Sequence, residues 1–352
     1  MAQSDLERIA AELQKGNDFV ICGHVSPDGD CLGSQLALAC ALRSLGKRVR
    51  CVFATDGVYD CGLAFLPGME EIVPACSYDG PLDTFVAVDV PTTERMGDAA
   101  RLHEEARLTV TIDHHAAPAT VSDLNYVDPD AAATAEIVWK LVRLMGVSPT
   151  PELATCAYTG LVTDTGRFQY QNTSAAALAA AAEMVKAGAD AARIARQVYQ
   201  NRTLASVLLE ARAIKRMRLR CDGKVALSWL SLGDFIECNA NKNDAEPLID
   251  VLRSLSGVRV ACMLREQEDA VRGSFRAKDE TDVAALARTF GGGGHKAAAG
   301  FTVEGSLAHA VQLVEGLLDD RLSAEKPTDS ESRASHADAL EVAASGKGGA
   351  VS

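Results

Sequence analysis

The chain has 352 residues, of which 47% are hydrophobic and 24% charged, as in a soluble globular protein of about two domains. Its formal net charge of −13 argues against tight binding to long DNA or RNA, which requires an extended basic surface. The first 15 residues lack the apolar core of a signal peptide, and no apolar run reaches the ~18 residues of a membrane span. We therefore expect a cytoplasmic protein that does not contact membranes.

In chain order, an amphipathic helix is predicted for residues 1–15, and four apolar strands follow it. The strands are predicted at residues 19–22, 49–53, 84–88 and 108–112. A helix at 32–45, ended by Gly46, joins the first two strands into a βαβ unit, which implies a parallel sheet with a right-handed crossover. Further helices are predicted at residues 133–145, 152–163 and 174–187.

The second part of the chain begins with a helical pattern at 190–209, which we interpret as a connector between two domains. Strands are then predicted at 224–230, 258–264, 270–276 and 300–303, and helices at 245–255, 283–290 and 307–322. This pattern indicates a smaller C-terminal α/β domain at 210–322, after an N-terminal α/β domain at 1–189. Residues 323–352 have too little apolar surface to fold and are expected to form a disordered tail.

The ten cysteines include no Cys-x-x-Cys pair, and most lie among apolar neighbours. Such cysteines are typical of small buried side chains in a reducing compartment, while zinc or disulfide chemistry is the less favoured alternative.

Acidic and histidine side chains follow three of the predicted strands directly. Because an open α/β sheet binds its ligands at the carboxyl ends of its strands, these side chains should meet at one edge. A further acid, Asp164, follows the apolar stretch 158–163. The residues that follow the strands are His24, Asp28, Asp30, Asp89, Asp113, His114 and His115.

Each of these residues also has an ordinary structural explanation when it is taken alone. Asp28-Gly-Asp30 could be a turn, Asp89 a helix cap, and the His114-His115 pair structural. Taken together, so many carboxylates cannot all stay ionised in one cleft without compensating positive charge, which two divalent cations would supply. Aspartate and histidine ligands without a thiolate suit Mn²⁺, with Mg²⁺ or Zn²⁺ as alternatives.

A run of glycines between the predicted helix at 283–290 and the predicted strand at 300–303 is the second candidate site. Successive glycines mark a loop with unusual backbone angles or close approach to a ligand, and their N–H groups can form an anion-binding nest. A flexible linker is the alternative. The candidate substrate-binding residues are Ser274, Arg276, Gly291, Gly292, Gly293, Gly294 and His295, with Lys296 as a further cation.

Together these motifs resemble those of the DHH phosphoesterase superfamily, and Gly291-Gly-Gly-Gly-His295 resembles the signature of its DHHA1 domain. The resemblance spans roughly residues 15–322. It points to the short two-domain nanoRNases, oligoribonucleases that often also remove the 3′-phosphate of 3′-phosphoadenosine 5′-phosphate. It implies an α/β fold with a parallel-sheet DHH domain that has helices on both faces, a smaller C-terminal α/β DHHA1 domain, and an active site in the cleft between them.

The resemblance also implies how the metal ligands are shared between two divalent ions. His24 and Asp28 would hold one ion, and Asp89 would bridge both. The other ion would be held by Asp30, His114 and Asp164. Cys31, which follows Asp30, is expected to face inward without a ligand role.

The remaining motif residues would act on the substrate. His115 would face the substrate phosphate and help neutralise the transition state or protonate the leaving oxygen, while Asp113 would orient a ligand. The glycine loop, His295 and Arg276 would hold the terminal phosphate of a short RNA or nucleotide. A homodimer is compatible with the sequence.

Other members of the superfamily fit the sequence less well. A pyrophosphatase has a different second domain, and a RecJ-type exonuclease would carry an added OB-fold and a more basic surface. A cyclic- or linear-dinucleotide phosphodiesterase stays open as an alternative activity. A non-catalytic nucleotide sensor is the alternative from another class, although no metal ligand is missing here.

Overall fold

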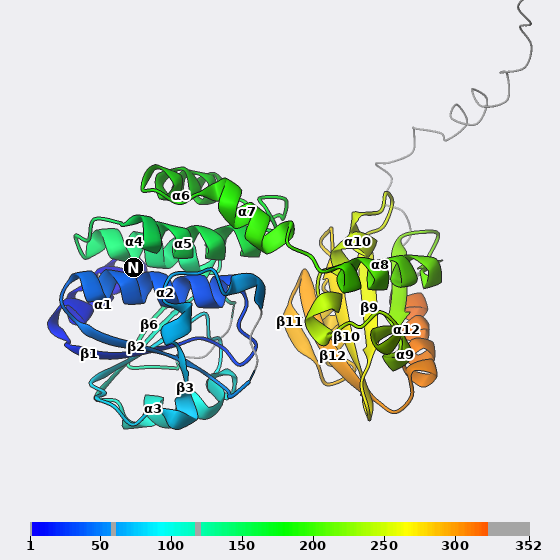
Figure 1. Ribbon diagram of the computed structural model, residues 1–352, viewed down its shortest axis with the longest axis horizontal. Coiled ribbons are helices and arrows are strands. Elements are labelled where there is room, and N and C mark those ends of the chain that lie inside the picture. Colours follow the sequence, from blue (N-terminus) through cyan, green and yellow to red (C-terminus); the bar gives the residue numbers. More distant parts are fainter. Residues whose placement is uncertain (1, 58–60, 117–120, 323–352) are drawn as a thin grey trace, which may run out of the picture. The chain divides into compact units, whose positions relative to one another are not determined.

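The computed structural model describes residues 2–57, 61–116 and 121–322, so the predicted tail at 323–352 lies outside the described residues. The chain divides into two compact units, Met1–Thr203 and Leu204–Ser352 (Figure 1). The division falls inside the stretch 190–209 that we interpreted as one connector. No described helix has the length and apolar character needed to cross a membrane.

The first unit is built on a six-stranded parallel sheet with the order β3-β2-β1-β4-β5-β6. The strand order reverses between β1 and β4, and such a switch point opens a crevice at the carboxyl ends of the two strands. The strands are β1 Asp18–Cys22, β2 Arg48–Phe53, β3 Val73–Pro74, β4 Thr84–Val88, β5 Leu108–Asp113 and β6 Leu124–Val127.

Helices cover both faces of this sheet (Figure 1). α1, α2, α4 and α5 lie on one side, α3 lies on the other, and α6 and α7 pack outside α4 and α5. Their bounds are α1 Ala2–Lys15, α2 Gly29–Ser44, α3 Ala100–Glu105, α4 Thr134–Leu144, α5 Pro151–Asp164, α6 Ala175–Lys186 and α7 Ala191–Tyr199.

Two glycines bring α2 and α5 unusually close together. A Cβ added to Gly33 would lie 2.5 Å from the Cys156 carbonyl oxygen, and one added to Gly160 would lie 2.9 Å from Asp30 Oδ1. Because neither residue has a Cβ, the backbones can cross in near contact. The crossing places the end of α5, which carries Asp164, beside the first turn of α2.

The second unit has a mixed six-stranded sheet with the order β11-β12-β10-β9-β8-β7, in which only the β8–β9 pair is parallel. One apolar cluster joins a face of the sheet to α8 and α10, and another joins the opposite face to α11 and α12. The strands are β7 Arg218–Arg220, β8 Val225–Leu230, β9 Val260–Glu266, β10 Ala270–Ala277, β11 Gly293–His295 and β12 Ala298–Glu304. The helices are α8 Leu204–Arg216, α9 Leu232–Glu237, α10 Leu248–Ser254, α11 Val283–Arg288 and α12 Leu307–Leu322.

Several sequence predictions need correction. The predicted connector is two helices, since α7 contributes Ile194 to the core of the first unit and α8 contributes Leu209 to that of the second. α2 begins at Gly29 rather than at residue 32, because Asp28 caps it. The sequence patterns missed elements that are short or lie at a sheet edge, where apolar alternation is weak. The missed elements are β3, β6, β7, β11, α3 and α9.

Candidate metal centre

The first group of predicted site residues lies where β1 leads into α2. His24 follows β1 and is only 4% exposed. Asp28 is the N-cap of α2, and its Oδ1 accepts hydrogen bonds from the backbone N–H groups of Asp30 and Cys31, each at 3.1 Å. This cap explains why a short polar loop can present three potential ligands with little flexibility.

Asp89 lies at the centre of the site, directly after β4. Its backbone has a φ of 60°, in the left-handed region that few non-glycine residues occupy, and its N–H donates to the Ile112 carbonyl of β5. One carboxylate oxygen, Oδ2, lies 3.4 Å from His24 Nε2. The other, Oδ1, lies 3.7 Å from His114 Nε2 and accepts a hydrogen bond from Thr134 Oγ1 at 3.0 Å. Asp89 therefore presents one oxygen to each side of the site.

The triplet that ends β5 separates into different environments. Asp113 is 1% exposed, and its Oδ1 accepts from the His114 and His115 N–H groups and lies 2.6 Å from His115 Nδ1. The His114 ring points instead toward the other acids, with Nε2 3.9 Å from Asp30 Oδ2 and 3.7 Å from Asp164 Oδ2. The triplet thus has a carboxylate that orients its neighbours and two imidazoles with different surroundings.

Asp30 is held by backbone groups that lie about a hundred residues away in the sequence. The N–H groups of Thr134 and Ala135, at the start of α4, donate to Asp30 Oδ2 and Oδ1 at 2.7 and 2.9 Å. A helix N-terminus is a favourable partner for a carboxylate because its backbone N–H groups lack partners within the helix.

Among the described residues, three groups of potential metal ligands meet at this edge. In each group, one ligand atom per residue lies within 4.8 Å of the others. The groups are His24, Cys31 and Asp89; Asp89, His114 and His115; and Asp30, His114 and Asp164. They share members, so they form one continuous site.

Burial and crowding perturb the acids and imidazoles strongly. Burial raises the pKa of Asp164 to about 7, although His114 opposes the shift. Burial also raises the pKa of Asp30 well above its usual range, and Asp89 adds to the effect. Burial alone would lower the pKa of His114, yet the carboxylates of Asp164 and Asp30 raise it to about 9. The site therefore needs positive charge, and its carboxylate and imidazole donors fit divalent cations.

Three further residues lie near the predicted ligands, although the sequence patterns did not mark them as part of the site. The Cys31 thiol lies within 4.8 Å of ligand atoms of His24 and Asp89. Arg95 accepts from the Val25 N–H through its carbonyl, its positive charge acts to lower the pKa of His24, and its buried Nε has no hydrogen-bond partner among the described residues. Asn172 donates from Nδ2 to the Asp164 carbonyl at 3.1 Å. No periodic pattern marks these residues, because only the folded chain brings them to the sheet edge.

The predicted substrate residues of the second unit lie on and beside β10. Ser274 and Arg276 lie on the same face of this strand, and Ser274 Oγ accepts from Arg265 Nη2 at 2.7 Å. Arg276 Nη1 donates to the Phe275 carbonyl at 3.0 Å. β12 is the next strand, and its Gly300 pairs with both Ser274 and Gly293, so these positions share one strip of the sheet.

The glycine run differs from the predicted nest. The Gly291 and Gly292 N–H groups donate to the carbonyls of Arg288 and Ala287, which ends α11, and Gly293–His295 form β11. A Cβ on Gly292 would lie 2.2 Å from the Gly300 carbonyl oxygen, so glycine is required there for close packing on β12. Lys296 is paired with Glu280 at 2.5 Å. Packing against β12 therefore accounts for part of the glycine run.

Comparison with known proteins gives two family matches. The N-terminal domain of the DHH family matches residues 18–161, and the DHHA1 domain matches residues 222–320. A protein of Thermus thermophilus named bifunctional oligoribonuclease and PAP phosphatase NrnA is 32% identical over 85% of this chain and 88% of its own length. The Bacillus subtilis protein of the same name is 29% identical over 81% of this chain and 89% of its own length.

Solved structures agree on the fold. An exopolyphosphatase-related protein from Bacteroides fragilis has a TM-score of 0.84 and 26% identity, with 90% of this chain and 96% of that chain covered. RecJ from Thermus thermophilus, solved with Mn²⁺, has a TM-score of 0.58 and 15% identity, with 92% and 55% covered. The chain therefore belongs to the DHH family and carries a DHH domain followed by a DHHA1 domain.

Proposed function

We propose that this protein is a metal-dependent phosphoesterase that hydrolyses short oligoribonucleotides to mononucleotides and also removes the 3′-phosphate of 3′-phosphoadenosine 5′-phosphate. The observation that carries the proposal is the position of Asp89, whose two carboxylate oxygens face His24 on one side and His114 on the other. The names of the relatives in Thermus thermophilus and Bacillus subtilis support the same pair of activities.

The proposed cofactor is a pair of divalent ions, with Mn²⁺ favoured. His24 and Asp28 would hold one, Asp89 would contact both, and Asp30, His114 and Asp164 would hold the other. When bound, such ions activate water as a nucleophile and neutralise charge on the phosphoryl oxygens. The surplus of carboxylates over imidazoles at the site supports this assignment.

Two residues of the chain itself, Asp113 and His115, would position a catalytic imidazole and supply a proton to the substrate. The contact between Asp113 Oδ1 and His115 Nδ1, at 2.6 Å, fixes the orientation of the ring and favours a proton on Nδ1. With a second proton on Nε2, the imidazolium of His115 would donate that proton to the leaving oxygen or neutralise the developing charge on the phosphate. Burial of Asp113 keeps this pair out of solvent and strengthens its interaction.

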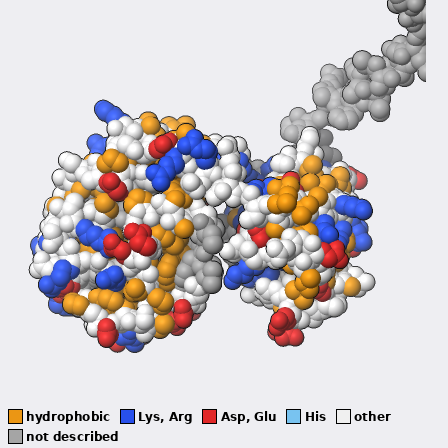
Figure 2. Space-filling view, viewed as in Figure 1, with side chains coloured by type: hydrophobic (Ala, Val, Ile, Leu, Met, Phe, Trp, Pro, Cys, Tyr) orange, Lys and Arg blue, Asp and Glu red, His pale blue; other side chains and the backbone are white. Residues whose placement is uncertain are grey.

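The proposed substrate is short because a chain with a net charge of −13 does not favour electrostatic binding along a long strand. On the face shown in Figure 2, Lys and Arg side chains on each unit alternate with acidic ones and form no continuous basic surface. Affinity would come from end contacts, for which Arg276, Ser274, His295 and the glycine segment 291–294 are our candidates. Arg95 is a further candidate within the first unit.

A substrate panel with purified protein and Mn²⁺ tests the proposal. We expect release of mononucleotides from 5′-labelled RNA dinucleotides and short oligomers, and release of phosphate from 3′-phosphoadenosine 5′-phosphate. Cleavage of cyclic dinucleotides alone would favour the alternative phosphodiesterase activity. Binding of nucleotides without turnover in any divalent metal would favour the sensor.

A further inference from the structure

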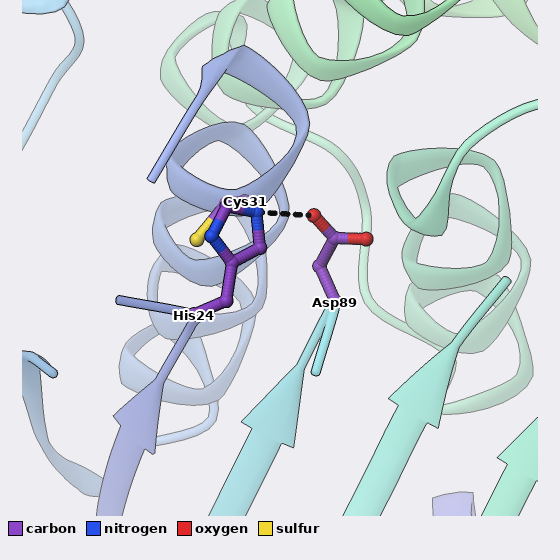
Figure 3. A group of neighbouring side chains, drawn as sticks. All are labelled: His24, Cys31 and Asp89. Atoms are coloured by element: carbon purple, nitrogen blue, oxygen red, sulfur yellow. Dashed lines mark ion pairs between the residues drawn. The ribbon is translucent and has the colours of Figure 1, made fainter. Parts of the chain in front are cut away.

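The thiol of Cys31 lies beside two predicted metal ligands, although the sequence led us to expect no ligand role for this residue. Cys31 lies in the first turn of α2, and its Sγ is grouped with ligand atoms of His24 and Asp89 within 4.8 Å (Figure 3). All three residues are buried, with exposed fractions of 0% for Cys31, 4% for His24 and 2% for Asp89. His24 and Asp89 come from the ends of neighbouring parallel strands, so the three side chains converge from three separate elements.

The position of this thiol is set by the backbone. The Cys31 N–H donates to Asp28 Oδ1, which holds the first turn of α2 in place. A Cβ on Gly23 would lie 2.0 Å from Cys31 Sγ, so the sulfur occupies space that only a glycine at the end of β1 leaves open. The thiol therefore packs against the strand end that leads into His24, and a short, one-carbon side chain gives it little freedom to move away.

The spacing is close to that of a shared ion. Donors bound to one tetrahedral ion at about 2.0 to 2.3 Å lie about 3.3 to 3.8 Å apart. His24 Nε2 and Asp89 Oδ2, at 3.4 Å, already meet this spacing, and the 4.8 Å limit of the group leaves the sulfur a shift of about 1 Å to join them. A mixed set of imidazole, carboxylate and sulfur donors favours Zn²⁺, Co²⁺ or Cd²⁺ over Mg²⁺, because sulfur is a soft ligand. The group of Asp30, His114 and Asp164 contains only nitrogen and oxygen donors.

We propose that Cys31 is a thiolate ligand of the ion that His24, Asp28 and Asp89 hold, and that this half of the centre selects a thiophilic divalent cation. On binding, the sulfur donates an electron pair to the cation and its proton leaves to the solvent, with no change in oxidation state. The neighbouring half of the centre has no such preference. The inference rests on the metal centre of the proposed function, adds a ligand to it, and replaces Mn²⁺ by a thiophilic ion in this half alone.

Cobalt absorption spectroscopy tests this assignment on the full chain after removal of metal with a chelator. Co²⁺ bound through sulfur gives an intense charge-transfer band in the near ultraviolet, whereas nitrogen and oxygen ligands give only weak visible bands. We expect the intense band in the native protein and in a Cys76→Ser control, in which an exposed cysteine is removed. Cys31→Ser should lose the band and weaken Zn²⁺ binding by at least about tenfold.

Cadmium NMR of the native protein gives a second readout that needs no variant. A thiolate ligand moves the ¹¹³Cd resonance far downfield of the range for oxygen and nitrogen ligands. A cobalt band that persists in Cys31→Ser, or ¹¹³Cd resonances that all lie in the oxygen and nitrogen range, would overturn the proposal. In that case turnover of RNA dinucleotides by the native protein would leave the proposed function standing, whereas a chain that binds no Co²⁺ at all would refute both.

Discussion

Replacement of Asp89 by asparagine should abolish hydrolysis while the fold persists. Asparagine keeps the size of the side chain and, like aspartate, tolerates the left-handed φ of 60° at this position, which alanine tolerates less well. Its carbonyl can still accept the hydrogen bond from Thr134 Oγ1. The change therefore removes a charge and one ligand oxygen with little structural disturbance.

The expected magnitude follows from the distances at the site. A unit charge pair at the 3.4 Å that separates Asp89 Oδ2 from His24 Nε2 is worth about 5 kcal/mol at an effective dielectric constant of about 20. A cation held at the same carboxylate would lose an interaction of at least this order. Since each 1.36 kcal/mol changes a rate by about tenfold, we expect kcat to fall by about 10³-fold or more.

The assay is hydrolysis of bis-p-nitrophenyl phosphate and of an RNA dinucleotide in Mn²⁺, with thermal unfolding as the measure of the fold. Asp98→Asn, which changes an exposed acid, is the matched control and should retain activity. Addition of Mn²⁺ should raise the melting temperature of the native protein and of the control much more than that of Asp89→Asn. Turnover of Asp89→Asn within a few-fold of the native rate would refute the reasoning.

Three further predictions concern the substrate residues and the second unit. Arg276→Ala should raise KM for a 5′-phosphorylated dinucleotide more than KM for bis-p-nitrophenyl phosphate, and equal effects would argue against a contact with the substrate end. Arg95→Ala should raise KM for both substrates by about tenfold without weakening Mn²⁺ binding. The reason is that a cation close enough to affect His24 would contact the phosphate that both substrates carry. An unchanged KM would exclude a phosphate contact by Arg95. Asp234→Asn should lower the free energy of unfolding at pH 7 by about 2 to 3 kcal/mol in urea titrations, because the buried Asp234 carboxylate pairs with two arginines. Glu268→Gln, at an exposed position, is the control and should have little effect. Burial opposes the shift, but the hydrogen bonds from those arginines and from Ser231 lower the pKa of Asp234 below the ordinary aspartate pKa of 3.8. Its contribution to the free energy of unfolding is therefore present above pH 3.8 and should be lost as the pH falls through and below this value. A constant difference between native and variant down to about pH 2 would contradict this.

The sequence predicted the central strands of the first unit well because local pattern determines them. β1 and β4 are nearly continuous apolar runs, as strands covered on both faces must be, while β2 and β5 keep apolar β-branched or aromatic residues between Arg or Thr. The single βαβ pattern implied a parallel sheet. The short outer strands carry no comparable pattern. The glycine run at 291–294 was ambiguous for a related reason: glycine marks both a ligand loop and a close packing contact, and only the neighbouring Phe301 and Gly300 on β12 show which applies at Gly292.

The candidate ligands were recognisable because each follows a predicted strand or an apolar stretch directly. What the sequence could not provide is their spatial order. That β1 lies beside β4, and β4 beside β5, depends on pairings between residues far apart in the chain, and these pairings bring His24, Asp89 and His114 together. The local sequence likewise contains no signal for the distance between the Cys31 sulfur and His24.

The sequence by itself determined the types of element, the two α/β units and the set of aspartate and histidine side chains at the strand ends. These follow from local periodicity and from residue chemistry, which act over a few residues. The tertiary structure alone decided that the two oxygens of Asp89 face different histidines, which backbone N–H groups hold Asp30, and that the Cys31 thiol lies beside His24 and Asp89. These are long-range contacts, and their geometry depends on packing such as the close crossing of α2 and α5 at Gly33 and Gly160.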